Sequence, residues 1–367
     1  MMSLYVHIPF CARKCLFCSF VVSIGQAQRA DEYIDALDRE AQRYRGARLD
    51  TVYIGGGTPT FLHERQLDVL VETIHRNFDV SRVSEWTIEA NPEGLDLAKT
   101  KFLKARGFNR LSIGVQSFDD RYLKFLGRNH DRQLALRSYA DAREAGFDNI
   151  NLDLMFGFPG QTLEELSQDL RVLTQLHSEH VSLYNLTIEG NSRFHAKQLK
   201  LDDDEYLADQ YVHIYGTLQT NGLCQYEVSN FARPGFGSKH NTSYWDGSPY
   251  IGLGVGAHSF LDRRRYWNVS KLQDYLSRVA LNGEAVEGFE DLSAHTLLME
   301  RILFGLRKNE GVGIGDIERQ LGIKLDEKRE QMLDQWVRDG FLVRDKERLI
   351  TTMKGRLVLD ELSIRFI

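Results

Sequence analysis

The chain has 367 residues, of which 42% are hydrophobic and 27% are charged, as in most soluble globular proteins. This length and composition exclude a disordered chain, a fibrous protein and a small disulfide scaffold, and they suggest about two domains. Lys and Arg number 46 against 52 Asp and Glu, so the net charge of −6 provides no general attraction to nucleic acid or to an anionic membrane.

The sequence shows no targeting or membrane segment. No apolar run approaches the about 18 residues that a membrane span needs. The first ten residues, MMSLYVHIPF, lack a basic region followed by an apolar stretch, so they do not read as a signal peptide. We therefore expect a cytoplasmic protein without a transmembrane segment.

The first half of the chain alternates short β-rich runs with amphipathic helical stretches. The predicted strands are residues 4–8, 51–54, 86–89, 110–115, 151–155 and 181–186. Helical patterns lie between most of them, at residues 31–45, 65–77, 131–145 and 162–176. Strands separated by helices imply an α/β fold of parallel βα units with right-handed crossovers. Ligands of such folds bind where the loops after the strands converge.

The pattern changes after about residue 190. A helix at 205–218 and a strand at 226–229 precede a stretch rich in glycine and aromatic residues, 231–260. Helices are then predicted at 294–306, 314–321 and 328–339, followed by β-like runs at 341–344 and 348–351 and a last helix. We therefore divide the chain into a barrel domain (1–225), an extension (226–290) and a mostly helical C-terminal domain (291–367).

The C-terminal segment has a winged-helix-like outline, because its helices are followed by a small β-hairpin. That outline raises the alternative of a DNA-binding regulator. The segment carries 14 basic and 14 acidic side chains, so it lacks the positive surface that DNA binding requires. A domain that packs against the rest of the chain or docks a partner is favoured, and we expect no nucleic-acid partner.

Three of the four cysteines lie within eight residues, at Cys11, Cys15 and Cys18. Thiolates are soft ligands that suit iron–sulfur clusters and zinc. A structural zinc site takes four protein ligands, and no fourth Cys or His follows closely. The spacing therefore favours a cluster held by three cysteines, with zinc and unligated thiols as the alternatives. Cys224 stands alone, and we expect it to be a small buried hydrophobe.

Cys-x3-Cys-x2-Cys in a loop after a first strand resembles the signature of radical S-adenosylmethionine proteins. Further motifs extend the resemblance to the group of oxygen-independent coproporphyrinogen III oxidases and haem chaperones. These motifs are YVHIPFC (5–11), GGGTP (55–59), EANP (89–92), GVQSF (114–118), GR (127–128), NLDLM (151–155) and GFPGQT (157–162). The resemblance implies a partial (β/α)6 barrel, in agreement with the strands predicted independently, followed by a C-terminal helical domain.

The resemblance also implies a 4Fe-4S cluster whose open iron binds S-adenosylmethionine and cleaves it to a deoxyadenosyl radical. Phe17 would lie near the adenine, and Arg128 would meet the methionine carboxylate. Glu89 and Asp153 would accept hydrogen bonds from the ammonium or the ribose, and Gln116 would serve the ribose. Taken singly, these residues are more typical of tight turns, helix caps and solvated surfaces than of a cofactor site. The full set implied for the cofactor is Tyr5, Phe17, Gly56, Gly57, Thr58, Glu89, Gln116, Arg128 and Asp153.

Two branches of this group differ in features that the sequence displays. The oxidase branch carries a further cysteine two positions after the third cluster cysteine, where this chain has Phe20. It also has a long segment before the first strand, whereas this chain begins its strand near residue 3. Both differences favour the chaperone branch. An oxidase, or a related tetrapyrrole-modifying radical enzyme, is the alternative, so whether the protein is an enzyme stays open.

Residues 240–245 (HNTSYW) resemble a motif associated with haem binding in the chaperone branch. An imidazole is a common axial haem ligand, and Tyr244 and Trp245 could stack on a porphyrin beside His240. A hydrogen-bonded histidine beside packed aromatic residues is the alternative, and His258 is a second candidate ligand. The resemblance implies that haem is the cargo, that respiratory apo-haemoproteins receive it, and that a small electron donor reduces the cluster.

Overall fold

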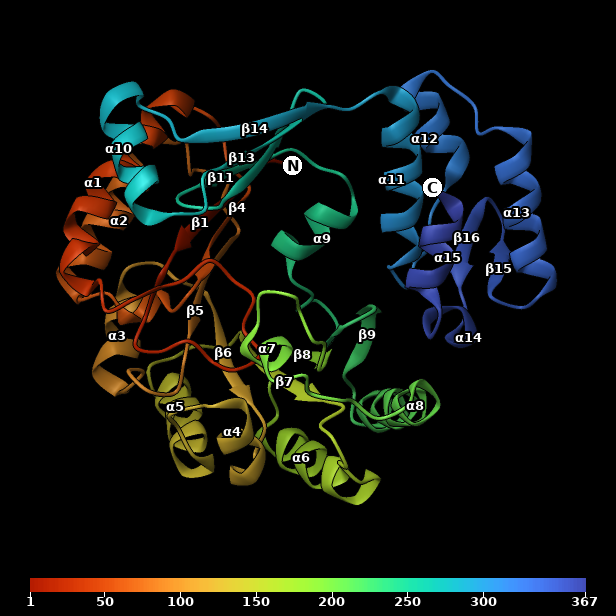
Figure 1. Cartoon of the computed structure of the whole chain (residues 1–367), viewed down its shortest axis with the longest axis horizontal. Coiled ribbons are helices and arrows are strands. Elements are labelled where there is room, and N and C mark those ends of the chain that lie inside the picture. Colours follow the sequence, from red (N-terminus) through yellow and green to blue (C-terminus); the bar gives the residue numbers. More distant parts are fainter.

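The computed structural model describes residues 1–367 and is organised around one large sheet (Figure 1). Its centre consists of six parallel strands in chain order, which confirms the predicted α/β architecture. They are β1 (Ser3–Ile8), β4 (Thr51–Gly56), β5 (Glu85–Ala90), β6 (Arg110–Gln116), β7 (Ile150–Phe156) and β8 (His180–Asn185). Most residues of these strands are buried, as in parallel sheets covered by helices.

Helices connect successive strands and cover the outer face of the sheet. They are α1 (Ala30–Ala41), α2 (Glu64–Asn77), α3 (Leu97–Ala105), α4 (Asp120–Leu126), α5 (Arg132–Glu144), α6 (Leu163–Leu176) and α8 (Asp204–Thr220). Their ends follow local capping chemistry. Thr162 and Glu165 form a capping box at the start of α6, and Asp131 accepts a hydrogen bond from the Leu134 amide at the start of α5. Both helices begin within one residue of their predicted starts at 162 and 131.

The sheet continues beyond both edges of the barrel to a total of 12 strands. On one side β11 (Tyr250–Leu253) runs parallel to β1, and β12 (His258–Leu261), β13 (Arg264–Asn268) and β14 (Val286–Asp291) follow antiparallel. On the other side β10 (Asn230–Ala232) and β9 (Cys224–Glu227) extend β8. Residues 226–290, predicted as an extension, therefore continue the barrel's own sheet. Helix α10 (Leu272–Asn282) packs into the same core.

The burial expected for Cys224 is wrong. Its side chain is partly exposed, because β9 is the outermost strand and alternate residues of an edge strand face away from the core.

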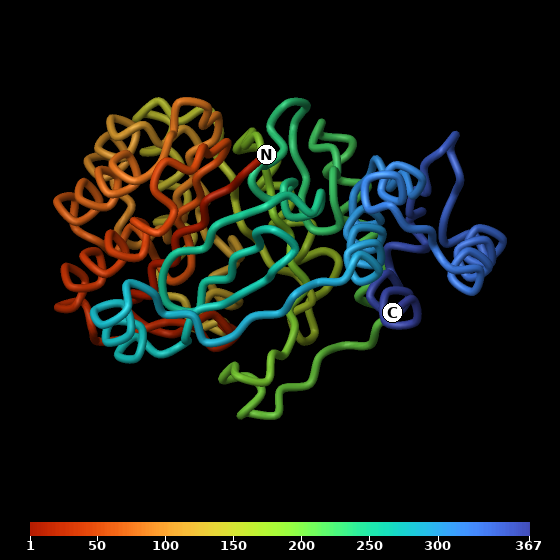
Figure 2. The backbone as a smooth tube through the Cα atoms, turned by 90° about the horizontal axis from the view of Figure 1, so that it is seen from above, coloured from red at the N-terminus to blue at the C-terminus, as the bar shows by residue number.

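Residues 294–366 form a unit with a hydrophobic core of its own at one end of the molecule (Figure 2). Its core includes Trp336 and Phe366, whose ring centroids lie 5.7 Å apart. The elements are α11 (Ala294–Leu306), α12 (Ile314–Leu321), α13 (Glu327–Arg338), β15 (Leu342–Asp345), β16 (Arg348–Thr351), α14 (Met353–Arg356) and α15 (Leu359–Phe366). This order matches the predicted helices and β-hairpin. No helix in the chain has the length and apolar character that crossing a bilayer requires.

Helix α9 (Lys239–Trp245) closes the amino ends of β1, β4 and β5. Buried Glu85 at the start of β5 accepts hydrogen bonds from the Lys239 and His240 amides, at 2.9 Å each. The hydroxyl groups of Ser3 and Ser243 lie 2.8 Å apart. The first turn of α9 is thus bonded to the bottom of the barrel, and its amide groups are satisfied by a buried carboxylate.

Candidate cofactor site

A cavity of about 1100 Å³ lies inside the barrel and opens at the carboxyl ends of the strands. Its lining comes from the loops after β1, β4, β5 and β6, from β7 and β8, and from the start of α15. Among the predicted site residues, those on its wall are Cys11, Cys15, Phe17, Cys18, Gly56, Gly57, Thr58, Glu89, Gln116, Arg128 and Asp153. The structure therefore brings together residues that are spread over more than a third of the sequence.

The cysteine loop is tied to the barrel at both its base and its tip. Short strands β2 (Phe10–Cys11) and β3 (Ser23–Ile24) pair and hold its two ends together. At the tip, the Leu16 amide donates to the carbonyl of Leu126, and the Phe194 amide at the start of α7 (Arg193–Ala196) donates to the carbonyl of Leu16. Irregular backbone between fixed ends allows the three thiols to face the same cavity.

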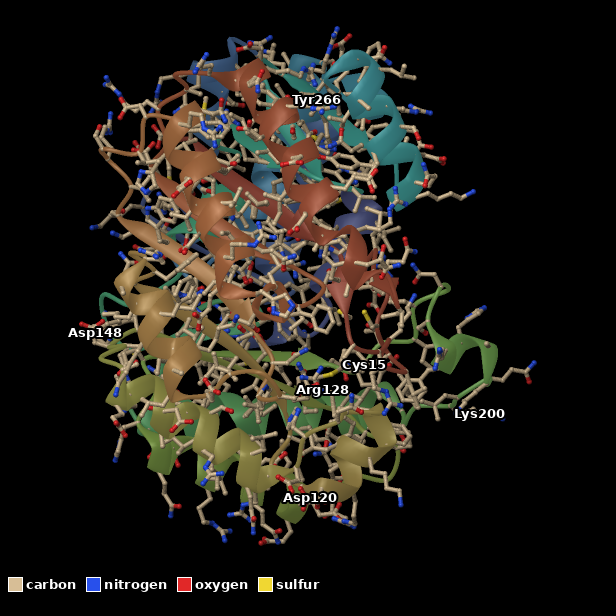
Figure 3. The ribbon with its side chains drawn as sticks, turned by 90° about the vertical axis from the view of Figure 1, so that its left-hand side faces the viewer. Cys15, Asp120, Arg128, Asp148, Lys200 and Tyr266 are labelled. Atoms are coloured by element: carbon tan, nitrogen blue, oxygen red, sulfur yellow. The ribbon has the colours of Figure 1, made fainter.

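Hydrogen bonds link Cys11 to Cys15 through three other side chains. The Thr58 hydroxyl lies 3.3 Å from Cys11 Sγ and accepts a hydrogen bond from Asn91 Nδ2 at 2.8 Å. Arg128 Nη2 donates to Asn91 Oδ1 at 2.7 Å, and Arg128 Nη1 donates to Cys15 Sγ at 3.4 Å. Figure 3 shows Cys15 and Arg128 side by side. Sequence reasoning did not assign Asn91 to the site, although its place directly after β5 is the signal that could have found it.

The three thiols do not converge on a point where a single ion would be bound. A cubane would take each of the three cysteines on a different iron. Burial raises the pKa of the Cys11 thiol to about 11, although the hydrogen bond with Thr58 lowers it. Binding of iron therefore has to release thiol protons.

The glycine turn after β4 leaves no room for side chains. A Cβ on Gly57 would lie 2.9 Å from Cys11 Sγ and from two backbone carbonyl oxygens. Gly56 has φ of +111°, and a Cβ there would lie 2.6 Å from the His7 ring. Glycine is required at both positions, because any side chain would displace the cysteine loop or the first strand.

Glu89 lies under this turn with both carboxylate oxygens engaged. Tyr53 donates its hydroxyl to Oε1 at 2.7 Å, and the Gly56 amide donates to Oε2 at 3.0 Å. Burial raises the pKa of Glu89 to about 7, although these two hydrogen bonds lower it. A partly buried carboxyl on a cavity wall, with its pKa raised toward neutrality, is typical of a ligand site.

A bulge near the end of β6 turns Gln116 into the cavity. Gln116 has φ of +72°, and the register with β7 shifts between Gly114 and Gln116. A non-glycine residue in the left-handed region costs about 1–3 kcal/mol of strain, which such sites often carry. Gly114 lies directly beneath, and its carbonyl accepts a hydrogen bond from Arg128 Nη2 at 2.7 Å.

Asp153 lies on β7, deeper in the cavity. Asn151 donates to its Oδ1 at 2.7 Å, and Ser112 donates to its Oδ2 at 3.1 Å. Burial raises the pKa of Asp153, while these hydrogen bonds and the positive charge of Arg110 lower it. Arg110 is 1% exposed and lines the same cavity. Its buried guanidinium was not anticipated, because a strand-initial arginine normally faces solvent.

Tyr5 is the one predicted cofactor residue that does not line this cavity. Its ring packs against Tyr53, with centroids 6.2 Å apart, and its hydroxyl lies 3.0 Å from His7 Nδ1. Tyr5 therefore supports Tyr53, which in turn donates to Glu89.

The three predicted haem residues lie on α9 in different surroundings. His240 is 1% exposed, and its Nδ1 and Nε2 each lie 2.9 Å from a hydroxyl, of Thr51 and Tyr244 respectively. Burial lowers the pKa of His240 to about 3. An iron ligand role would require the imidazole to leave one of these hydrogen bonds. Tyr244 and Trp245, by contrast, line a second pocket.

The second pocket has a volume of about 670 Å³ and lies between α9, the strands β11–β13 and helix α11. It shares four wall residues with the cofactor cavity: Tyr184, Ser229, Asn241 and Arg307. The two spaces therefore adjoin inside the molecule.

Comparison with known proteins agrees with this geometry. Residues 5–173 match the model of the radical SAM superfamily, and residues 292–358 match the HemN C-terminal domain. The chain is 37% identical to the heme chaperone HemW of Bacillus subtilis, covering 100% of this chain and 99% of the relative. It is 36% identical to the HemW of Lactococcus lactis, over 96% and 94% of the two chains. The chain belongs to the HemW family of radical SAM proteins.

Among solved structures, the coproporphyrinogen III oxidase HemN of Escherichia coli matches this chain over its whole length. Its TM-score is 0.87 at 28% identity, and the match covers 100% of this chain and 89% of that protein. The HemW family and HemN thus share both the barrel and the C-terminal domain, which confirms the predicted fold and family resemblance.

Proposed function

We propose that this protein is a haem chaperone that holds a 4Fe-4S cluster and S-adenosylmethionine, binds haem and transfers it to apo-haemoproteins. The observation that carries the proposal is similarity over the full chain to relatives named heme chaperone HemW. An aromatic pocket beside the cofactor cavity supports it, because a chaperone needs a place for its cargo apart from its cofactor. The same proposal includes a small electron donor that reduces the cluster and respiratory apo-haemoproteins that accept the haem.

The donor set of the cavity fits the cluster and S-adenosylmethionine. Cys11, Cys15 and Cys18 would hold three irons, and the glycine turn would admit the amino acid end of the cofactor. Arg128 would bind the carboxylate and Glu89 the ammonium. Gln116 and Asp153 would accept hydrogen bonds from the ribose, and Phe17 would pack on the adenine. A reduced cluster of this kind supplies an electron that breaks the sulfonium bond of S-adenosylmethionine.

The likeness to HemN favours a second candidate, oxidative decarboxylation of coproporphyrinogen III. At the position where the oxidase branch carries a further cysteine, this chain has Phe20, whose side chain is 63% exposed. A phenyl ring cannot replace a thiol in ligation or in redox chemistry. We therefore rank the oxidase second.

One experiment separates the two candidates. The reconstituted and reduced protein is incubated without oxygen with S-adenosylmethionine and coproporphyrinogen III, and protoporphyrinogen and deoxyadenosine are followed by chromatography. In parallel, haem is titrated into the same preparation, and its transfer to an apo-haemoprotein is measured. We expect haem binding and transfer without decarboxylation. Stoichiometric conversion of coproporphyrinogen would refute the chaperone proposal in favour of the oxidase.

The ionisation of Glu89 predicts how affinity for S-adenosylmethionine depends on pH. Because the pKa is about 7, the carboxyl is largely neutral below that pH and cannot pair with an ammonium. Affinity should therefore rise as pH increases through about 7 and level off above it.

The effect of Glu89 ionisation on the stability of the protein runs in the opposite direction with pH. Between the ordinary value of 4.5 and about 7 the folded state binds more protons than the unfolded state, so the free energy of unfolding falls as pH rises.

Calorimetric titration of the reconstituted protein with S-adenosylmethionine, below and above about pH 7, measures this dependence. Glu89→Gln keeps the shape of the side chain but cannot ionise, so its affinity should be low and nearly independent of pH over the same range. A variant that retained the wild-type rise would show that another group controls it.

A further inference from the structure

The second pocket has an aromatic floor set by the register of three strands. Tyr250 on β11, Phe260 on β12 and Arg265 on β13 pair side by side across the sheet. His258 lies two residues before Phe260 and shares its face of β12.

Helix α11 supplies the opposite wall of the pocket. Its residues there are Leu297, Glu300, Arg301 and Phe304, and Trp245 packs edge-on to Phe304 with ring centroids 5.9 Å apart. At about 670 Å³ the pocket is of the size that binds small organic ligands, about 300–1,000 Å³.

Three buried N–H groups on residues of this wall have no partner. They are Trp245 Nε1, Arg301 Nε and Arg307 Nε. The guanidinium of Arg307 also lies over the Trp245 ring, 5.0 Å from its centroid. Buried donors without acceptors cost free energy, and two of these belong to arginines. Arg301 Nη1 already donates to Gln320 at 2.9 Å and Arg307 Nη1 to Asp360 at 3.1 Å, so the Nε groups are the donors left without a partner for the carboxylates of a flat aromatic ligand.

His258 is the one histidine on the wall of this pocket. Its ring is exposed and forms no hydrogen bond within the chain. One face is held by Trp267 in a stacked arrangement, with centroids 5.8 Å apart and an interplanar angle of 27°. Trp267 in turn lies on Gly288, where a Cβ would be 2.6 Å from the indole. The imidazole is thus oriented by its neighbours but has both nitrogens free, unlike His240.

We propose that haem, the cargo of the proposed function on which this inference rests, lies in this pocket with His258 as an axial iron ligand and Arg301 and Arg307 facing its propionates. Tyr250, Phe260 and Trp245 cover the porphyrin. Neutral imidazole with a free nitrogen is a normal haem ligand, and arginine is the side chain best suited to carboxylates.

His240 is then a positioning residue. Its hydrogen bond to the Tyr244 hydroxyl orients a ring that stands edge-on to Tyr250, with centroids 4.8 Å apart. Loss of the His240 imidazole would loosen the pocket wall without removing an iron ligand. His240→Ala should therefore weaken haem binding while the spectrum of the haem that does bind keeps its ligand signature.

The test is a titration of the full-length protein with ferric haem, followed by the Soret band and by electron paramagnetic resonance. His258→Ala should lower affinity about tenfold or more and change the spin state and Soret position. Added imidazole should restore the wild-type spectrum. His295→Ala is the matched control, because His295 is exposed on α11 outside the pocket, and it should bind haem as the wild type does.

A second measurement needs no change at His258. Iron protoporphyrin with both propionates esterified should bind the wild type about tenfold more weakly than haem, because the arginines lose their charged partners. Arg301→Ala should narrow this difference between haem and its ester, because only one of the two arginines, Arg307, then remains to face a propionate.

The outcomes separate this inference from the function. Wild-type protein that binds haem while His258→Ala binds equally well with an unchanged spectrum would overturn the ligand assignment and leave the chaperone proposal intact. Wild-type protein that does not bind haem would refute the proposed function itself.

Discussion

Replacement of Cys15 by Ser is expected to abolish assembly of the iron–sulfur cluster. Serine is a harder and less acidic ligand than cysteine, and a cluster held by two thiolates lacks its third anchor. No other thiol is available to replace it, because Cys224 lies on the edge strand β9 and does not line the cavity. Cys15 is partly exposed, so its loss should change the free energy of unfolding by less than about 1 kcal/mol.

Iron and sulfide content and the visible spectrum after anaerobic reconstitution measure the cluster, and far-ultraviolet circular dichroism with thermal unfolding measures the fold. Cys224→Ser is the control, and it should retain the wild-type content. A Cys15→Ser protein with full iron and sulfide would show that the loop does not hold the cluster. Loss of the fold together with the cluster would show that the loop is a structural site instead.

Replacement of Arg128 by Ala is expected to reduce affinity for S-adenosylmethionine by about 10–100-fold, as for other hydrogen bonds to charged groups. The guanidinium connects Cys15, Asn91 and the Gly114 carbonyl, and its buried Nε has no partner in the chain. The substitution therefore removes both a carboxylate partner and the connection that holds Asn91 against Thr58. Arg128→Lys should recover only part of the affinity, because an ammonium lacks the planar fork that reaches several acceptors.

Equilibrium binding of S-adenosylmethionine to reconstituted protein gives the measurement, with cluster content determined on the same samples. That second determination distinguishes a lost cofactor contact from a lost cluster. Arg121→Ala is the matched control, because Arg121 is exposed on α4 and pairs only with Asp119 and Glu165. If Arg128→Ala binds S-adenosylmethionine as tightly as the wild type at full cluster content, the carboxylate assignment is wrong.

Local pattern was enough to predict the parallel strands and most of the helices. Strand β16 and helices α11 and α12 occupy the predicted residues, because alternation and helical periodicity are properties of neighbouring residues. The cysteine spacing is also local, and so is the place of each motif directly after a strand. Once the strands are parallel, their carboxyl ends must meet, so Cys11, Glu89 and Gln116 reach one cavity.

Local pattern did not predict the strands between residues 230 and 291. Strands β11, β12 and β13 have four or five residues each, too few to show a clear alternation, and β11 lies in the stretch rich in glycine. Only their pairing with β1 and with one another makes them strands. For the same reason the burial of Arg110 and the position of Tyr5 behind Tyr53 were not foreseen, because both depend on what packs against them.

Residue types and their spacing were sufficient to predict the barrel, the cluster loop and the order of the cofactor motifs. Each strand, loop and motif is a pattern of a few consecutive residues. The tertiary structure decided which side chains are free to act. His240 and Thr51 are 189 positions apart, and their hydrogen bond occupies one nitrogen of an imidazole that the motif marks as a ligand. His258 carries no such motif, yet strand pairing leaves its ring exposed on a pocket wall. Whether a histidine nitrogen is available as a ligand depends on which distant segments of the chain pack against it, and only the tertiary structure determines this.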